Sequence, residues 1–328
     1  MSLLAVDGLT VTYQTQGGPV PAVRDVDLTL DQGQVLGLAG ESGCGKSTVA
    51  HALLRLLPPD TEVRGRVVLD GDDVLTMNWG RLRAVRWSEA AIVFQGAMHA
   101  LNPVRRARDQ IVEPILLHEK VTPAEAVRRA ESLLEEVGLP ARRGRDYPHE
   151  FSGGQRQRLM IAMALACRPK LLIADEPTTA LDVMVQAQVL RLLHGLQRDL
   201  GLAMLFITHD LSVLAQVCDS IAVMYAGRIV EIGPARDVFA APSHPYTRAL
   251  AGAFPTIGDP GFRMAPSGLG GDPPDPQAIP SGCPFHPRCP EAFDECPHND
   301  PALFDAGVNH RAACLLVPRM RSAAGQRL

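Results

Sequence analysis

The chain has 328 residues, of which 46% are hydrophobic and only 5% aromatic, and its formal net charge is −4. This length allows two domains, or one large domain with an appendage, and aliphatic side chains must fill most of the core. The acidic excess argues against nucleic acid as a partner, because domains that bind nucleic acid usually carry a basic excess.

The sequence has no run of the ~18–20 apolar residues that are needed to span a bilayer. Its N-terminus also has neither the basic region nor the long apolar region of a secretory signal. We therefore expect a cytoplasmic protein, whose cysteines are reduced or bound to metal rather than paired in disulfides.

The first predicted elements are strands. Residues 3–13 and 22–30 alternate apolar and polar side chains, as half-buried strands do, and the apolar run at 35–40 is typical of a fully buried strand. A helical pattern follows from residue 46 to 57, where two prolines end it. Further strands are predicted at 66–70 and 90–94.

Helical periodicity dominates from about residue 105 to 168, with helix starts near Thr122 and Ser152. After that, predicted strands and helices alternate. The strands are 170–175, 203–208 and 220–225, and the helices are 183–200 and 211–218. This alternation predicts an α/β fold with a mostly parallel sheet covered by helices on both faces.

The composition changes after about residue 254. Ten of the 27 prolines lie between Pro255 and Pro290, a density that forbids regular helix or central strand. We expect an extended connector over residues 255–280. The cysteine-rich segment that follows is too short to build a core of its own, so it needs a further source of stability, such as a covalent cross-link or a bound metal.

The segment from Gly40 to Ser47, GESGCGKS, matches the pattern G-x-x-x-x-G-K-[ST] between a predicted strand and a predicted helix. Glycines let backbone N–H groups point at phosphate oxygens, and the helix that follows adds its positive end. Lys46 would reach the β- and γ-phosphates, and Ser47 would bind Mg²⁺. The expected ATP contacts are Gly40, Ser42, Gly43, Cys44, Gly45, Lys46, Ser47 and Thr48. A glycine-rich turn that binds nothing is the alternative, and the motif alone does not separate a kinase, a GTPase and a transport ATPase.

Two carboxylates end the apolar run LLIADE at residues 171–176. Ligands of open α/β sheets bind at the carboxyl ends of strands, so we expect Asp175 and Glu176 beside the phosphate loop. Asp175 is assigned to Mg²⁺ and Glu176 to the base that polarises the attacking water. His209 ends another apolar run and could donate a hydrogen bond to the γ-phosphate. The alternatives are solvated acids at a strand exit and a turn or capping histidine.

A second candidate phosphate site begins at Ser152 in the run FSGGQ. Ser152 and Gln155 form a capping-box pattern, which is a generic helix start. Gly153 and Gly154 are unexpected there, because each costs about 1 kcal/mol in a helix relative to alanine. They make sense if a ligand approaches the backbone closely, at a helix N-terminus that can bind an anion.

Together these motifs resemble the nucleotide-binding domain of ATP-binding-cassette (ABC) proteins over about residues 3–250. The matching motifs are GESGCGKS (40–47), IVFQ ending at Gln95, FSGGQ (151–155), LLIADEP (171–177), TALD (179–182) and ITHD (207–210). The resemblance implies a P-loop (RecA-like) core with an antiparallel β subdomain and a helical signature subdomain at about 97–168, all within residues 1–254. It also implies a head-to-tail pair, in which the FSGGQ helix of one chain covers the ATP on the phosphate loop of the other.

The resemblance further implies roles for three residues. Tyr13 would stack on adenine, Gln95 would contact Mg²⁺ or the attacking water and relay to a membrane partner, and Asp182 would lie in a loop that crosses the dimer interface. The sequence departs from the family pattern at Phe151, where leucine is common, and at 96–104, where GAMHALNPV replaces a DPMTSLNP-like run. The second departure bears on which membrane partner is served.

Four cysteines crowd the C-terminal segment, namely Cys283, Cys289, Cys296 and Cys314. Such a group in a cytosolic protein indicates a metal site, although the spacings do not match the common zinc patterns. Four thiolates could hold Zn²⁺ or a [4Fe–4S] cluster, and free thiols are a third reading. The segment resembles the C-terminal extension of oligopeptide/dipeptide importers, which here would span residues 255–328, and this resemblance implies the iron–sulfur cluster.

The resemblances imply an ATPase subunit of an importer for di- or oligopeptides, with nickel or oligosaccharide as alternative cargo. The implied partners are a second ATPase subunit, expected to be a paralogue, two transmembrane permease subunits and an extracytoplasmic substrate-binding protein. The chain would lie at the cytoplasmic face of the membrane. Soluble ABC ATPases related to DNA repair have a long coiled-coil insertion between the phosphate loop and the signature motif. This class is disfavoured, because Lys46 and Ser152 are only 106 positions apart with no heptads between them. A small-molecule P-loop kinase would not have the FSGGQ site.

Overall fold

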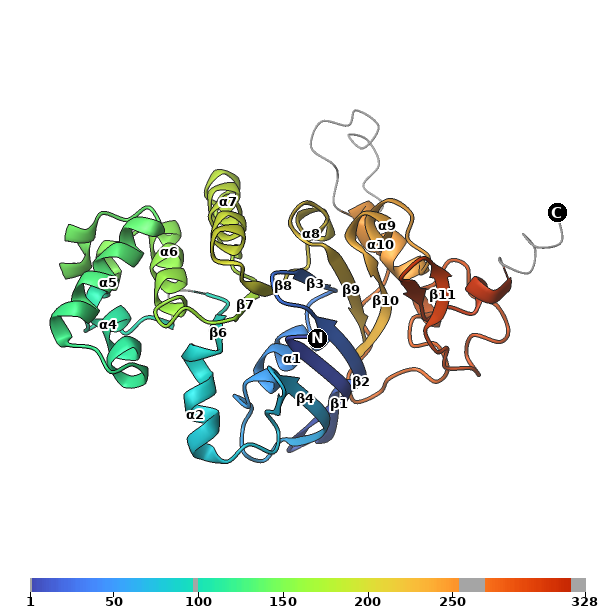
Figure 1. Ribbon diagram of the computed structural model, residues 1–328. Coiled ribbons are helices and arrows are strands. Elements are labelled where there is room, and N and C mark those ends of the chain that lie inside the picture. Colours follow the sequence, from blue (N-terminus) through green and yellow to red (C-terminus); the bar gives the residue numbers. More distant parts are fainter. Residues whose placement is uncertain (1, 97–99, 254–268, 320–328) are drawn as a thin grey trace. The chain divides into compact units, whose positions relative to one another are not determined.

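The structure, a computed structural model, describes residues 2–96, 100–253 and 269–319 (Figure 1). The predicted connector at 255–280 therefore lies outside the described residues up to residue 268, as do residues 97–99 of the segment that departs from the family pattern. The chain divides into two compact units. Unit 1 comprises residues 1–3, 30–34 and 70–207, and unit 2 comprises residues 4–29, 35–69 and 208–328.

A parallel sheet forms the centre of unit 1. Its strands lie in the order β8 (Ala203–Ile207), β7 (Leu171–Asp175) and β6 (Ala90–Val93). Leu171 pairs with Ala203 on one side and with Ala90 on the other. Every residue of β7 and β8 is buried, as expected for strands that are covered on both faces. The predictions at 90–94, 170–175 and 203–208 are confirmed.

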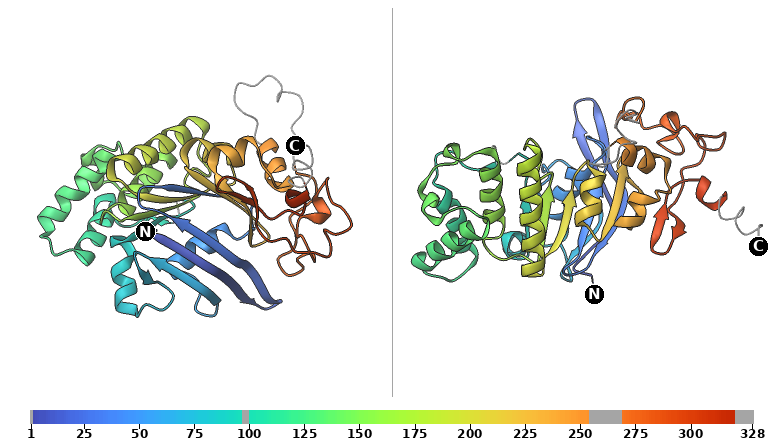
Figure 2. Two further views of the ribbon diagram at one scale, coloured as in Figure 1. Left: turned by 45° about the vertical axis from the view of Figure 1, so that its right-hand side comes forward. Right: turned by 90° about the horizontal axis from the view of Figure 1, so that it is seen from above.

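Helices make up most of the rest of unit 1. They are α2 (Trp79–Ser88), α4 (Ala107–His118), α5 (Pro123–Glu136), α6 (Gly153–Ala164) and α7 (Val183–Leu200), with short 3₁₀ turns η1 (Ala141–Arg145) and η2 (Pro148–Glu150). The two-residue strand β5 (Asp72–Asp73) precedes α2. Figure 2 shows α4, α5 and α6, in green, grouped together. The predicted start near Thr122 is confirmed, because its hydroxyl accepts a hydrogen bond from the N–H of Glu125.

An antiparallel sheet in unit 2 carries the N-terminal strands. Its order is β2 (Gly18–Leu30), β1 (Leu4–Thr15) and β4 (Glu62–Leu69). Strands β1 and β4 pair in antiparallel register, with Val6 opposite Val67. The burial patterns of β1 and β2 confirm the half-buried strands predicted at 3–13 and 22–30, and β4 confirms the strand predicted at 66–70.

The remaining strands of unit 2 are far apart in sequence but pair with one another. Their order is β11 (Phe304–Gly307), β12 (His310–Ala312), β10 (Arg228–Pro234), β9 (Ser220–Tyr225) and β3 (Val35–Ala39). Strands β3 and β9 are parallel, whereas β10, β11 and β12 are added in antiparallel pairs. Helices in the described part of this unit include α1 (Lys46–Leu53), α8 (Leu211–Val217), α9 (Ala235–Ala240) and α10 (Pro245–Ala253), with the 3₁₀ turn η4 (His286–Arg288).

The cysteine-rich segment is anchored to unit 2 by sheet pairing and by a buried carboxylate. Strand β12 pairs with β10, so that Glu231 lies opposite Ala312. The Glu231 side chain has no exposed surface, and His310 Nε2 lies 2.7 Å from its Oε1. The backbone N–H groups of Ser243 and His244 also donate to this carboxylate. The segment therefore shares the core of unit 2 instead of building a separate one.

None of the helices in the described residues is long and apolar enough to cross a membrane.

Candidate functional site

The phosphate loop connects β3 to α1 in unit 2, and its shape depends on glycine. Gly40, Gly43 and Gly45 have φ values of 150°, 79° and 107°, which favour glycine. A Cβ atom at Gly40 would lie 2.3 Å from the carbonyl oxygen of Met224, and one at Gly45 would lie 2.3 Å from that of Ala22. The backbone thus packs closely against β9 and β2, while no atom approaches the Cβ position of Gly43 within 4 Å.

Lys46 begins α1 and points back into the loop. Its side chain is only 5% exposed, and Nζ donates to the carbonyl oxygens of Gly40 (2.8 Å) and Glu41 (2.9 Å). The Cys44 sulfur lies 3.8 Å from the same nitrogen, and burial raises the pKa of this thiol. A buried cation, a helix N-terminus and a loop of backbone N–H groups form an arrangement that can bind an anion such as a phosphate chain.

Tyr13 lies beside this helix start. Its hydroxyl oxygen is 3.2 Å from Oγ1 of Thr48, in the residue that follows Ser47. Sequence alone could not connect β1 with the phosphate loop. This placement puts Tyr13 next to the residues expected to bind phosphate, and its stacking on adenine stays a prediction.

The two carboxylates at the end of β7 differ in their surroundings. Asp175 is 2% exposed. Glu176 has a φ of 45°, a strained value for a residue with a side chain, and its Oε2 accepts hydrogen bonds from Gln95 Nε2 and Thr179 Oγ1, both at 2.8 Å. Gln95 and Glu176 were predicted separately, and the structure brings them into direct contact. The contact of Thr179 with Glu176 has no signal in the sequence beyond the place of Thr179 in the TALD motif.

The helix start at Ser152 has the predicted capping box. Ser152 Oγ accepts from the N–H of Gln155, and Gln155 Oε1 accepts from the N–H of Ser152 at 3.1 Å. The two glycines differ in how closely neighbouring side chains approach them. A Cβ at Gly154 would lie 2.3 Å from Cγ1 of Val185, a neighbour in the same chain, whereas a Cβ at Gly153 would meet Leu181 at an ordinary 3.6 Å. Close packing therefore accounts for Gly154, whereas no close neighbour in this chain accounts for Gly153.

Asp182 caps α7, with Oδ1 accepting from the N–H of Val185 at 3.0 Å. The next two side chains, Val183 and Met184, are each 70% exposed, which is unusual for large apolar residues. His209 is exposed in unit 2, immediately before α8. The cap of α8 is Asp210, whose Oδ1 accepts from two backbone N–H groups, so His209 does not serve as the cap.

The candidate residues thus fall into two sets. Unit 2 holds Tyr13, the phosphate loop with Thr48, and His209, whereas unit 1 holds Gln95, Asp175, Glu176, Ser152 to Gln155 and Asp182. The predicted Mg²⁺ ligands Ser47, Gln95 and Asp175 come from both units, so this set stays a prediction.

The four C-terminal cysteines are neighbours in unit 2. Burial raises the pKa of the Cys283 thiol to about 11, and the charges of Cys314, Cys296 and Cys289 add to this rise. However, within the described ranges no group of three or more His, Cys, Asp or Glu side chains is arranged to hold a metal ion. These side-chain positions do not support the predicted [4Fe–4S] or Zn²⁺ site.

One partner of the phosphate loop was missed from the sequence. Arg288 contacts the side chain of Glu41 from 247 positions away. No local pattern in the sequence connects these two residues, because their contact forms only on folding.

Comparisons with known proteins identify two regions of the chain. Residues 23–179 match the ABC transporter family, and residues 230–296 match the family described as oligopeptide/dipeptide transporter, C-terminal region. The oligopeptide transport ATP-binding protein OppD of Salmonella typhimurium is 46% identical over 314 residues, which are 95% of this chain and 93% of that protein. The dipeptide transport ATP-binding protein DppD of Bacillus subtilis is 42% identical over 318 residues, 96% of this chain and 94% of that one.

Solved structures are also similar. A dimeric post-hydrolysis state of the ATP-binding cassette MJ0796 bound to ADP and Pi matches with a TM-score of 0.64 and 28% identity, covering 71% of this chain and 99% of that one. The cbiO1 protein of Clostridium perfringens, part of the ABC transporter complex cbiONQ, matches with a TM-score of 0.62 and 28% identity, covering 73% and 91%.

Proposed function

Because this chain belongs to the ABC transporter family, as an ATP-binding subunit of the oligopeptide/dipeptide type and an ATPase, we propose that it powers the import of di- or oligopeptides. The proposed cargo class rests on the match of residues 230–296 to the C-terminal region of oligopeptide/dipeptide transporters. The chain is also 46% identical to an OppD protein. Nickel and oligosaccharide are the alternative cargoes.

The proposed reaction is ATP + H₂O → ADP + Pi. The water oxygen bonds to the γ-phosphorus, the bond to the β-phosphate bridging oxygen breaks, and Glu176 accepts the proton of the water. Gln95, which contacts the Glu176 carboxylate at 2.8 Å, orients that water, and His209 donates to the γ-phosphate. Lys46 and the loop N–H groups would bind the phosphates, while Ser47, Gln95 and Asp175 would hold Mg²⁺, which would neutralise phosphate charge.

The second half of each ATP site comes from a partner ATPase chain. The N-terminus of α6, with Ser152 and Gly153, would cover the γ-phosphate held on the partner's loop. Two observations support a surface of this kind near α7: Asp182 lies at its start, and the exposed Val183 and Met184 follow directly. The partner chain is a paralogue or a second copy.

The remaining partners are two transmembrane permease subunits and an extracytoplasmic substrate-binding protein, with this chain at the cytoplasmic face of the membrane. Residues 1–254 form the nucleotide-binding domain in this proposal, and residues 255–328 form the C-terminal extension.

The test is to purify the membrane complex from cells that make the tagged chain, identify the co-purified binding protein, and determine its bound ligand by mass spectrometry. We expect two permease subunits and a bound peptide, and ATP hydrolysis in liposomes that rises when binding protein and peptide are added. A binding protein that carries nickel or an oligosaccharide would overturn the cargo. Recovery of the chain without any membrane protein would overturn the transport role.

We also propose that the four-cysteine set binds a cluster or metal, on the support that all four cysteines lie between residues 283 and 314 of the sequence. Anaerobically purified protein should contain iron and acid-labile sulfide if the cluster is [4Fe–4S], and one zinc per chain if the metal is Zn²⁺. Protein that contains neither, with four thiols open to alkylation, would contradict the proposal.

A further inference from the structure

The C-terminal extension reaches the phosphate loop through a nearly buried ion pair. Arg288 Nη1 lies 2.7 Å from Glu41 Oε2, and Nη2 lies 3.0 Å from Oε1. The side chains are only 8% and 21% exposed. Two parallel N–H···O bonds between charged groups fix both distance and orientation, and the contact with Glu41 raises the pKa of Arg288. This pair is therefore a specific junction and differs from an exposed surface ion pair, which contributes little.

The extension holds Arg288 firmly in place. Its Nε donates to the carbonyl oxygen of Gly270 at 2.9 Å. Phe285, three residues earlier, is 1% exposed and packs against the rings of Tyr225 and Tyr246, with centroid distances of 5.3 and 5.4 Å. The guanidinium is thus attached to a rigid aromatic cluster, and little conformational entropy remains to be lost when it binds Glu41.

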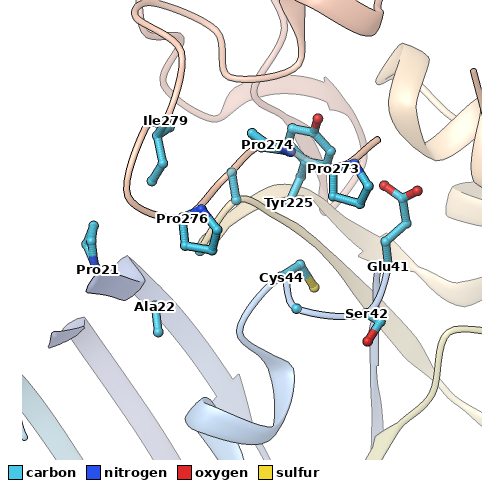
Figure 3. Close-up of a pocket in the computed structure, with 13 residues that line it drawn as sticks. Pro21, Ala22, Glu41, Ser42, Cys44, Tyr225, Pro273, Pro274, Pro276 and Ile279 are labelled. Carbon is cyan, nitrogen blue, oxygen red and sulfur yellow. The ribbon is translucent and has the colours of Figure 1, made fainter. Parts of the chain in front are cut away.

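Prolines of the extension also lie over the loop. Pro273, Pro274 and Pro276 line a cavity of about 170 Å³, and the opposite wall includes Ser42 and Cys44 (Figure 3). The fixed φ of proline makes this stretch a stiff wall beside the loop.

Glu41 connects the ion pair with Arg288 to Lys46, the lysine expected to bind phosphate. Its N–H donates to the Tyr246 hydroxyl at 2.9 Å, and its carbonyl oxygen accepts from Lys46 Nζ at 2.9 Å. The side chain, the N–H and the carbonyl of this one residue are therefore each held by a different partner. A change at Arg288 must alter the position of Glu41 and, through it, the start of the loop and Lys46.

We propose that Arg288 is a positioning residue for ATP binding, which holds the phosphate loop in its binding conformation through Glu41. This rests on the assignment of residues 40–47 as the ATP phosphate loop. Arg288 directly precedes Cys289, so the cysteine-rich segment is joined to the nucleotide site by this pair. The extension is then part of the ATP site of its own chain.

The test measures the dissociation constant for ATP and the Michaelis parameters of the full-length chain in its transporter complex. Arg288→Ala and Glu41→Gln each remove the pair from one side. We expect each to weaken ATP binding roughly tenfold, with the double variant no weaker than either single one, because the two changes remove the same contact. The kcat at saturating ATP should stay within about twofold of wild type, and Arg288→Lys should recover only part of the loss, since it keeps the charge without the bidentate geometry.

Arg248→Ala is the matched control. It breaks an exposed ion pair between α10 and Glu291 of the extension that does not touch the loop, and we expect ATP binding to be unchanged. Glu41→Gln leaves every residue of the extension in place, so misfolding of the extension cannot explain its effect.

Three results would overturn the proposal: ATP affinity within twofold of wild type in Arg288→Ala, additive losses in the double variant, or an equal loss in Arg248→Ala. Lys46→Ala separates this failure from failure of the loop assignment. If Lys46→Ala binds ATP as wild type does, the assignment of residues 40–47 is wrong. If Lys46→Ala loses ATP but Arg288→Ala does not, only the positioning role is wrong.

Discussion

At the scale of single residues, Tyr13 offers a ring and a hydroxyl group with separable roles. The hydroxyl oxygen contacts Thr48 Oγ1 at 3.2 Å, and the ring is proposed to stack on adenine. Tyr13→Phe removes only the hydroxyl contact, whereas Tyr13→Ala also removes the ring. We expect Tyr13→Ala to weaken ATP binding by about tenfold or more, given the ~1–3 kcal/mol typical of base stacking, and Tyr13→Phe to bind nearly as wild type. Fluorescence titration checks this, and equal losses in both variants would rule out stacking.

His244 should make the stability of the fold depend on pH. It is 1% exposed, burial lowers its pKa to about 4, and its Nδ1 accepts from the N–H of Tyr246 at 3.0 Å. The carboxylate of Glu231 opposes this lowering, and Arg248 adds to it. The unfolded chain takes up a proton near pH ~6.5, the ordinary pKa of histidine, while the folded chain does not until about pH 4.

His244 therefore makes its full contribution to the free energy of unfolding above pH ~6.5. This contribution, at most roughly 3 kcal/mol, is lost as the pH falls toward 4. Urea unfolding should show that the free energy of unfolding decreases as the pH is lowered from 7 to 5. This window lies above the pH range in which most carboxylates titrate. The slope of this decrease should be shallower in His244→Gln. Identical slopes for the two proteins would show that His244 is not the group responsible.

At the scale of elements, the N-terminus of α6 carries two adjacent glycines that can be tested against each other. Gly154→Ala places a methyl group 2.3 Å from the stiff side chain of Val185, and we expect a loss of about 1–3 kcal/mol in unfolding free energy. Val185→Ala should restore part of it. Gly153→Ala meets only an ordinary contact, so stability should be kept while ATP turnover falls, because the methyl group occupies the face offered to phosphate. A stable, fully active Gly154→Ala protein would contradict this packing.

The same comparison of elements shows what the sequence could and could not predict. Strands β3, β7 and β8 were predictable because they are short, continuous apolar runs, and the starts of α5 and α6 were predictable from Thr122 and Ser152, whose side chains cap them. Helix α2 was missed, since its periodicity is weak and non-helical dihedral angles interrupt it at Arg86 and Trp87.

Long-range partners escaped prediction for a different reason. Strand β10 pairs with β12, which lies about eighty residues later, and no local pattern reveals that register. Long-range contacts within the candidate site escaped prediction for the same reason. The loop, the carboxylates and the FSGGQ run were identified from local motifs, but the contacts of Glu176 with Gln95 and of Glu41 with Arg288 depend on tertiary folding.

At the scale of the whole molecule, each of the two units carries a helix start that we propose binds the phosphates of ATP. Unit 2 has Lys46 at the start of α1, and unit 1 has Ser152 at the start of α6, with Asp182 and two exposed apolar side chains at the start of α7. A single ATP needs one such site of each kind. We infer that two chains share two ATP molecules, that ATP joins them, and that loss of the γ-phosphate lets them part.

The most direct measurement of this mechanism is ATP turnover and nucleotide retention in a purified transporter complex that carries Glu176→Gln. The amide keeps the hydrogen bonds available to Gln95 and Thr179 but cannot accept the proton of the water. We expect ATP to bind and to be retained unhydrolysed in a closed pair of ATPase subunits, with turnover at the altered site reduced by about 10²-fold or more. Hydrolysis at the wild-type rate, with no retained ATP, would contradict the role of Glu176 and the ATP-joined pair.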